Sequence, residues 1–434
     1  MEPSVLVIGG GIAGIQAALD VAEQGVKAYL VERSPSIGGH MAMLDKTFPT
    51  LDCSLCILTP KMVDVARHPN IKLLTYCELL DVKKVGKGFE VRIVKKPRYV
   101  DESKCTGCGI CMEKCPVRVP SEFEQGLGMR RAIYMPFPQA VPRKATIDPE
   151  HCLYITKGKC RVCERFCPAG AIDFEQKPQE ITLHVGAIIV ATGFRLVDVS
   201  GLSEYGFGRF KNVITALQLE RLLNASGPTG GELLRPSDGR RPRRVAFIQC
   251  VGSRDKRIGN PYCSRVCCMY AAKNAVLIRE HYPDVEPTIY YMDLRAYGKG
   301  FEEFVERARE EFGVNFVRGR VARIEEDPTS KDLLLMVENT ETGELLRERY
   351  ELVVLSVGLA PPEGHELLSE LLGLRTDDYG FFESDNPKTN PTSGPEGVFI
   401  CGCAAGPKDI PDSVAEASAA AMQAVNYLRE AGLL

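Results

Sequence analysis

The sequence lacks tryptophan, has only six histidines among 434 residues and carries little net charge. Its 54 Lys and Arg against 57 Asp and Glu give a formal charge of −3, which excludes a general attraction to nucleic acid or anionic lipid. No apolar run approaches the ~18 residues of a transmembrane helix, and residues 185–192 form one of the longest. The start, MEPSVLVIGG, lacks the basic segment of a secretory signal. We therefore expect a cytoplasmic protein without a membrane span. A partner subunit could hold this protein at the cytoplasmic face of a membrane.

Cysteine is present in unusual number, with 17 residues or about 4% of the chain. Small disulfide scaffolds contain roughly 8–10% cysteine, and an odd count cannot be fully paired within one chain. The sequence is therefore not that of a secreted disulfide protein, and its reduced thiols are available for metal or redox chemistry. At roughly 150 residues per domain, the length predicts two or three domains.

A dinucleotide-binding fold is predicted at the start of the chain. Residues 4–8 form a short apolar strand, a G-x-G-x-x-G motif opens a helix, and a second strand ends on Glu32. Gly9 permits the tight turn, Gly11 lets backbone approach a pyrophosphate, and Gly14 lets helix and strand pack closely. Glu32 can accept hydrogen bonds from ribose hydroxyls. The position of the motif between strand and helix favours a nucleotide site over a structural glycine turn.

Three later segments favour FAD. Gly38 and Gly39 follow the second strand, residues 186–193 form a strand ending in Ala-Thr-Gly, and residues 397–406 form another strand and glycine turn before a long helix. This order resembles the FAD-binding half of the two-dinucleotide-domain flavoproteins, to which thioredoxin reductase belongs. In that family an Asp follows the glycine of the last strand, whereas here Cys403 follows it, so that contact must be made differently.

We expect these residues to hold FAD: Gly9, Gly11, Ile12, Ala13, Gly14, Glu32, Arg33, Gly39, His40, Met41, Ala191, Thr192, Gly193, Gly402, Cys403, Lys408, Asp409 and Ser413. Lys408 and Asp409 are candidates for tuning the flavin, with solvated loop residues as the alternative.

A second dinucleotide-type domain is predicted from strands at 243–249 and 285–293. The turn after the first of these strands, residues 250–254, contains only one glycine, Gly252. A pyridine nucleotide would meet side chains where it needs bare backbone. The segment therefore predicts a dinucleotide-type domain that has lost its nucleotide.

Two cysteine runs have the spacing of bacterial ferredoxins. The first is C-x2-C-x2-C-x3-C-P, and the second repeats it with seven residues in the first gap. Because the last cysteine of each run ligates the other cluster in two-cluster ferredoxins, we expect two [4Fe–4S] clusters with exchanged fourth ligands. The expected ligand sets are Cys105, Cys108, Cys111 and Cys167 for one cluster, and Cys152, Cys160, Cys163 and Cys115 for the other. A pair of zinc sites is the alternative, which the two consecutive ferredoxin-type runs disfavour.

The third group has a C-x12-C-x3-C-C spacing and consists of Cys250, Cys263, Cys267 and Cys268. A buried thiol cluster or a catalytic disulfide would be alternatives, but four cysteines at a phosphate-type turn favour a third [4Fe–4S] cluster. Spacing alone leaves Cys53 and Cys56 open between a redox dithiol, cluster ligands and packed thiols. Packing is favoured over a redox role for Cys401 and Cys403, and Cys77 is expected in the core.

Long stretches resemble the A subunit of the CoB–CoM heterodisulfide reductases and its relatives, which include the A subunit of the quinone-interacting membrane-bound oxidoreductase. They are VLVIGGGIAGIQAALD, GGHMAMLDKTFPTLDCSLCILTPKM, CTGCGICMEKCPV, CVGSRD with YCSRVCCMYAAKNA, and CGCAAGPKDIPDSVAEASAAA. The resemblance implies a cubane cluster at the third cysteine group and a redox role for Cys53 and Cys56, which become the catalytic candidates. Because the methanogen protein is longer at both ends, the resemblance favours the shorter relatives.

We therefore expect an α/β, thioredoxin-reductase-like two-dinucleotide-binding-domain flavoprotein with an inserted two-cluster ferredoxin domain. The expected domains are 1–100, 178–240 and 351–434 for FAD, 101–177 for the ferredoxin insert, and 241–350 for the second dinucleotide-type domain. The resemblance implies an electron-transfer subunit that works with other redox subunits, with a homodimer within the complex as a further expectation. Two alternatives are a stand-alone NAD(P)H-dependent disulfide or polysulfide reductase and a structural cluster-bearing subunit with a degenerate flavin site.

Overall fold

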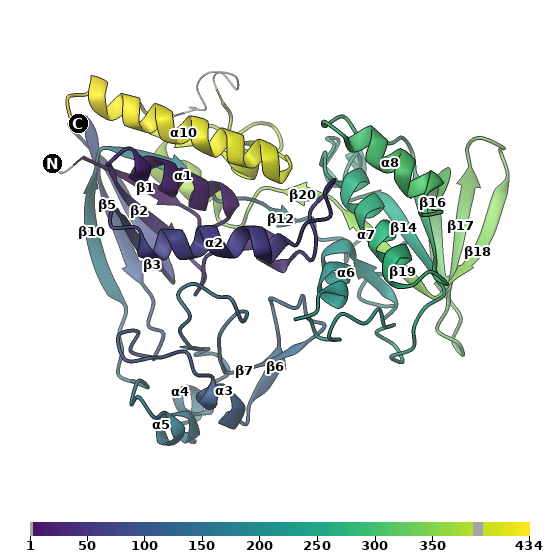
Figure 1. The fold of residues 1–434 in the computed structure, drawn as a ribbon, viewed down its shortest axis with the longest axis horizontal. Helices are drawn as coiled ribbons and strands as arrows, with labels where there is room; N and C mark the ends of the chain where they lie inside the picture. The colour runs from purple at the N-terminus through teal and green to yellow at the C-terminus, as the bar shows by residue number, and fades with distance from the viewer. Residues whose placement is uncertain (1–2, 385–393) are drawn as a thin grey trace. The chain divides into compact units, whose positions relative to one another are not determined.

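The computed structural model describes residues 3–384 and 394–434 (Figure 1). Contacts divide the chain into two compact units. Unit 1 contains residues 1–42, 56–194 and 361–434, and unit 2 contains residues 43–55 and 195–360. This division separates compact bodies rather than functions, so the boundaries of the five predicted domain segments remain predictions.

Unit 1 is built on a five-stranded parallel sheet of order β21-β11-β1-β2-β3. Its strands are β1 (Ser4–Ile8), β2 (Lys27–Glu32), β3 (Ile71–Thr75), β11 (Ala187–Val190) and β21 (Val398–Ile400). All five residues of β1 are buried, as expected of a central strand covered on both faces. The helices α1 (Ile12–Glu23) and α10 (Ile410–Glu430) lie side by side along this sheet (Figure 1). The predicted opening strands and helix are confirmed.

A three-stranded antiparallel sheet adjoins the parallel one in the core of unit 1. Its strands are β4 (Cys77–Val85), β5 (Gly88–Lys95) and β10 (Gln179–Val185). Cys77 is buried in this core, as predicted. The other helical segments outside the insert are α2 (Ser54–Arg67), α9 (His365–Leu372), η1 (Gly39–Met43) and η3 (Gly402–Ala405).

The segment between β5 and β10 has its own small core, made largely of cysteine, alanine and isoleucine side chains. Its elements are α3 (Ile110–Lys114), β6 (Arg118–Pro120), β7 (Met129–Arg131), β8 (Ile133–Tyr134), β9 (Thr146–Ile147), α4 (Leu153–Lys157) and α5 (Val162–Phe166). These elements are too short to bury many side chains of their own, so the cysteine side chains make up much of this core.

Unit 2 is built on a seven-stranded sheet of order β13-β19-β14-β15-β16-β17-β18. The strands are parallel as far as β16, and β16, β17 and β18 form an antiparallel meander. They are β13 (Val213–Thr215), β14 (Arg244–Val251), β15 (Glu286–Tyr291), β16 (Asn315–Glu326), β17 (Leu333–Asn339), β18 (Leu345–Tyr350) and β19 (Leu352–Val357). Its other elements are α6 (Ala216–Leu223), α7 (Cys267–His281), α8 (Phe301–Glu310), η2 (Lys256–Ile258) and the two-strand pair β12 (Arg195–Leu196) and β20 (Leu359–Ala360). Both predicted strands of the second dinucleotide-type domain are confirmed as β14 and β15.

None of the helices in residues 3–384 and 394–434 combines the length and the apolar character that a membrane crossing requires.

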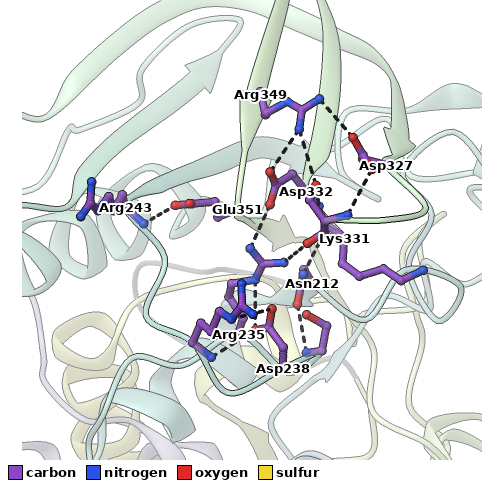
Figure 2. A network of polar contacts seen from close by, with 12 residues as sticks. Asn212, Arg235, Asp238, Arg243, Asp327, Lys331, Asp332, Arg349 and Glu351 are labelled. Carbon is purple, nitrogen blue, oxygen red and sulfur yellow. Dashed lines mark hydrogen bonds and ion pairs between the residues drawn. The ribbon is translucent and has the colours of Figure 1, made fainter.

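A buried polar network holds the amino-terminal edge of the unit 2 sheet (Figure 2). The guanidinium of Arg235 donates to Asp332 Oδ1 at 2.9 Å and to the Ser330 carbonyl at 2.7 Å, and its side chain is 6% exposed. Asn212, which is fully buried, accepts from the Ser237 amide and donates to the Lys331 carbonyl. The network therefore ties the loop before β14 to the turn between β16 and β17.

Replacing Arg235 by methionine should destabilise the protein by about 1–3 kcal/mol, because Asp332 and the Ser330 carbonyl lose their buried donor and Asp332 is left with the more exposed Arg349. Urea unfolding followed by far-UV circular dichroism measures the effect. The matched control is Arg307→Gln, which breaks an exposed pair with Glu311 and should cost less than about 0.5 kcal/mol. Equal losses in the two variants would contradict a structural role for the network.

Candidate functional site

The glycine motif after β1 has the close contacts that its spacing predicts. Gly9 has φ +104°, and a Cβ there would lie 2.4 Å from the Ala191 carbonyl oxygen. A Cβ on Gly14 would lie 1.8 Å from the Gly9 oxygen. Around Gly11, by contrast, a Cβ would meet no atom within 4 Å, and no side chain caps α1 at this residue. Gly9 and Gly14 are thus required by the fold itself, whereas Gly11 leaves the first turn of α1 open.

Glu32 lies at the end of β2, beside this turn. One carboxylate oxygen accepts from the Gly10 amide at 2.6 Å, and the other accepts from the Ser34 amide at 2.7 Å. Two backbone donors therefore fix the orientation of the carboxylate while each oxygen keeps a further lone pair. Arg33 is exposed and donates to the Glu363 carbonyl.

Thr192 follows β11 at the same edge of the sheet, because β1, β2, β11 and β21 are parallel and end together. Its hydroxyl is buried and has no hydrogen-bond partner within the described part of the chain. The neighbouring Ala191 is buried and Gly193 has φ +73°. A buried hydroxyl of this kind normally has a partner, so Thr192 is a candidate ligand contact at this edge of the sheet.

His40 lies in η1, where its imidazole stacks on Phe194 with ring centroids 4.2 Å apart and an interplanar angle of 14°. Burial, and then the charge of Arg33, lower the His40 pKa to about 4. The neighbouring Met41 is buried. Phe194 was not found from the sequence, although it directly follows the Ala-Thr-Gly turn.

The turn after β21 is held by a pair of charges that the sequence motifs did not reveal. Glu416 Oε2 accepts from the Gly402 amide at 3.1 Å and from Lys408 Nζ at 2.5 Å. Gly402 has φ +66°, and a Cβ there would lie 2.9 Å from the Ala13 Cβ. The turn at Gly402 therefore lies directly against Ala13 in the first turn of α1. The Cys403 thiol points to the Lys408 carbonyl at 3.4 Å.

Asp409 caps α10, because its carboxylate accepts from the Asp412 amide at 2.8 Å. The Ser413 hydroxyl donates to the Asp409 carbonyl at 2.7 Å. Burial raises the pKa of Cys401 to about 12 and also raises that of Cys403. Both thiols are therefore neutral in this environment, in keeping with their predicted packing role.

One cavity in the insert is lined by four cysteines from the two ferredoxin-type runs. They are Cys105, Cys108, Cys111 and Cys167, the set that the exchanged-ligand pattern predicts. The Cys167 thiol also accepts from the Ala171 amide at 3.3 Å. Burial raises the pKa of Cys111 to about 11, and the three other sulfurs of this set add to the shift.

The remaining cysteines of the insert lie beside this cavity. Burial, and then the neighbouring Cys152, raise the pKa of Cys163 to about 12, with smaller contributions from Cys115 and Cys111. Cys152, Cys163 and Cys115 are therefore close neighbours. Cys160 has φ +81°, an uncommon backbone conformation for a residue with a side chain.

The third group assembles at the carboxyl end of β14 and the start of α7. Cys267 is close enough to Cys250, Cys268 and Cys263 for each to raise its pKa, with burial as the largest cause. The Arg265 amide donates to Cys263 Sγ at 3.3 Å, and the Arg295 amide donates to Cys268 Sγ at 3.4 Å. Cys250 has φ +59° at an irregularity of β14.

Within residues 3–384 and 394–434, no three His, Cys, Asp or Glu side chains converge closely enough for one metal ion.

Cys53 and Cys56 are both disulfide-bonded, whereas the 15 other cysteines are free thiols. The segment that carries Cys53 is fixed by buried polar groups within unit 2. The Ser54 amide donates to the Asp45 carbonyl at 3.1 Å, and the Asp45 amide donates to Glu220 Oε2 at 3.0 Å. Glu220 in turn forms a fully buried ion pair with Lys273. The sequence did not reveal this support, because its partners are far apart along the chain.

The two sheets, the glycine turn at the first of them and the adjoining turns after β11 and β21 define a flavin-dependent oxidoreductase fold. The family model for pyridine nucleotide-disulphide oxidoreductases matches residues 3–424, and the chain belongs to this family. Thioredoxin reductases of T. acidophilum and Lactococcus lactis have the same fold, each with a TM-score of 0.54 and 99% coverage of both chains, at 16% and 17% identity. The predicted core fold is confirmed.

Within this family, the chain is similar to the A subunits of heterodisulfide reductases. It is 55% identical to the A subunit of the H2:CoB-CoM heterodisulfide,ferredoxin reductase of Methanothermobacter marburgensis, over 98% of this chain and 64% of that protein. It is 56% identical to the iron-sulfur A subunit of the CoB–CoM heterodisulfide reductase of Methanocaldococcus jannaschii, over 97% of this chain and 64% of that protein. The resemblance predicted from the motifs is confirmed, and the chain spans about 64% of the length of these relatives.

The burial of His40 leads to a prediction about its titration. Since its pKa is lowered from 6.5 to about 4, its imidazole should stay neutral between pH 7.5 and 5.5. NMR of ring-labelled histidine measures this, and the signal that disappears in His40→Gln identifies the residue. The unfolded chain binds a proton at His40 below about pH 6.5, so this residue should lower stability as the pH falls from 6.5 towards 4. A His40 signal that titrates near pH 6.5 would contradict its burial.

Proposed function

We propose that the chain is an FAD- and iron–sulfur-containing electron-transfer subunit of a heterodisulfide-reductase-like redox complex. The observation that carries the proposal is the cavity lined by Cys105, Cys108, Cys111 and Cys167. The two ferredoxin-type runs lie far apart in the sequence, yet Cys167 lies with the three cysteines that ferredoxin exchange predicts. This arrangement occurs on a chain whose core has the fold of flavin-dependent oxidoreductases.

FAD would be held at the carboxyl edge of the unit 1 sheet. The open turn at Gly11 and the uncapped start of α1, residues 12–14, offer backbone donors to a pyrophosphate. Glu32 is oriented to accept from a ribose, and the Thr192 hydroxyl is a buried group that lacks a partner within the described residues. Around them, we assign supporting contacts to the other predicted residues, which are Gly9, Arg33, Gly39, His40, Met41, Ala191, Gly193, Gly402, Cys403, Lys408, Asp409 and Ser413.

Three [4Fe–4S] clusters would be held by the three cysteine groups. A cavity surrounded by four sulfurs suits a cubane, in which each thiolate binds a different corner of the cluster. A single zinc ion would instead need all its sulfurs at about 2.3 Å from one point. The second set is Cys152, Cys160, Cys163 and Cys115, and the third is Cys250, Cys263, Cys267 and Cys268. Amide donors to the sulfurs of Cys167, Cys263 and Cys268 would raise the reduction potentials of their clusters.

A bound flavin supplies the exchange between two-electron and one-electron chemistry, and each cluster carries one electron. The chain's own residues would bind these groups, bury them and set their potentials. Cys53 and Cys56 are assigned as a redox-active C-x2-C pair, since both are disulfide-bonded and the Cys53 segment is rigidly supported. This pair is the catalytic candidate.

A stand-alone NAD(P)H-dependent reductase is the main alternative. The connection from β14 to α7 disfavours it, because residues 252–266 and two cysteines at the start of α7 take the place of a short glycine-rich phosphate turn. Partners would be other redox subunits, as the names of the relatives imply, with a quinone-interacting complex as the second possibility. The same proposal places the protein in the cytoplasm or at the cytoplasmic face of the membrane. It also includes a homodimer within the complex.

Replacing Gly11 by alanine should remove FAD without unfolding the protein. The new methyl group meets no protein atom within 4 Å but would occupy the path of the pyrophosphate, and an alanine at this helix start costs at most about 1 kcal/mol. Flavin released on anaerobic denaturation measures the loss. Gly201→Ala is the matched control, because Gly201 also has open space around it. Full flavin content in Gly11→Ala would refute this placement.

Replacing Cys167 by alanine should remove one cluster, or about four of about twelve iron atoms per chain. An anaerobic reductive titration should then take up about six electrons instead of about seven, counting two for FAD, one for each cluster and two for the disulfide of Cys53 and Cys56. Cys77→Ala is the control, since Cys77 is buried in the core of unit 1. Rapid reduction of the wild-type flavin by NADPH alone would favour the alternative reductase, and a protein without flavin would favour a structural role.

A further inference from the structure

Three buried polar side chains lie behind the third cysteine group, and two of them have no hydrogen bond at either polar atom. Gln249 and Asn274 each have a side-chain oxygen and a side-chain nitrogen without a partner within the described residues. The buried Ser356 hydroxyl lies beside the Tyr270 hydroxyl. Gln249 is 7% exposed, and the other two are fully buried. We call these three residues the polar triad. A buried polar atom left unpaired costs about 1–3 kcal/mol, so the four such atoms of Gln249 and Asn274 need an explanation.

The strand register places Gln249 and Ser356 on the same face of the unit 2 sheet. β14 and β19 are parallel neighbours, with Ile248 opposite Leu355. Ile248 and Leu355 both face the core cluster on one side of the sheet. Since side chains alternate along a strand, the next residues, Gln249 and Ser356, point to the other side, against which α7 packs.

The helix α7 presents Asn274 to this face together with Cys267. Cys267, Tyr270 and Asn274 are spaced i, i+3 and i+7, so they share one face of the helix. The Tyr270 hydroxyl donates to the Val357 carbonyl at 3.0 Å, which fixes this helix face against the end of β19. Tyr270 also lies beside Cys267 and Ser356, both of which influence its pKa. The polar triad is therefore next to the third cysteine group.

We propose that Gln249, Asn274 and Ser356 hold ordered water behind Cys267, and that this hydrated polar triad raises the reduction potential of the cluster of the third cysteine group. Buried water occurs where two to four polar groups can bond it, and the triad offers both donors and acceptors. Amide and hydroxyl donors near a cluster stabilise its reduced form, because that form carries one more negative charge. The proposal rests on the third cluster proposed above.

Redox potentiometry of the anaerobic holoprotein, followed by EPR, tests this inference. The signal that disappears in Cys263→Ala identifies the third cluster. At the solution potential where this cluster is half reduced in the wild type, Ser356→Ala and Asn274→Leu should each lower the reduced-to-oxidised ratio several-fold. A tenfold change corresponds to about 59 mV for a one-electron couple.

Ser237→Ala is the matched control, because Ser237 also has a buried hydroxyl without a partner among the described residues. It belongs to the network at the amino-terminal edge of the same sheet, whereas the cysteines lie at the carboxyl edge. This variant should leave the ratio unchanged. Pulsed EPR of wild-type protein in D2O should detect exchangeable deuterium near the third cluster, and Asn274→Leu should reduce that signal.

Two results would overturn the inference in distinguishable ways. If the wild type contains iron for only two clusters, both the third cluster and the role of the triad are refuted. If the third cluster is present but Ser356→Ala and Asn274→Leu match Ser237→Ala in potential, only the role of the triad is refuted. Ser356→Ala removes a single oxygen atom, so it remains informative if Asn274→Leu does not fold.

Discussion

The candidate redox site depends on the free-energy cost of burying cysteine thiolates away from water. Burial raises the pKa of Cys111 and Cys250 to about 11 and that of Cys163 to about 12. A thiolate is the form that ligates iron, and in such surroundings it is stable only when a cation replaces the lost hydration. Burial therefore disfavours these thiolates unless a bound cation compensates their charge, as the proposed clusters would do.

The backbone around the sulfurs follows from this constraint. Cys160 and Cys250 have positive φ angles of 81° and 59°, a conformation that costs of order 1–3 kcal/mol at residues with side chains. Such strain persists only when the surrounding structure fixes it. At Cys250 it coincides with the irregularity that shifts the pairing of β14 with β19. The strand departs from regular pairing where its side chain must turn towards the other cysteines.

Local signals in the sequence predicted much of the fold and part of the site. Apolar runs predicted the buried strands β1, β11, β14 and β15, because strands covered on both faces need continuous apolar residues. Ferredoxin spacing predicted Cys167 as a ligand together with the first run of cysteines, and Cys167 lines one cavity with three of them. Spacing was informative here because closely spaced cysteines on short loops have few alternative arrangements. Groups that act across long sequence separations could not be predicted in the same way. Glu416, which holds the turn at Gly402, and the buried pair of Glu220 with Lys273 have no motif, and their partners are brought together only by packing of whole elements.

The second sheet shows how one architecture can serve two kinds of anion. In a dinucleotide-binding domain, the helix after the first strand directs its amide groups and positive dipole end at a phosphate. Here the equivalent helix, α7, begins with Cys267 and Cys268 and has no side-chain cap. A thiolate at a helix start is stabilised by the same dipole. Under the proposed function, residues 252–266 and the start of α7 would keep this electrostatic advantage with sulfur in place of a phosphate. The missing glycine-rich turn and the cysteine group would then have one structural origin.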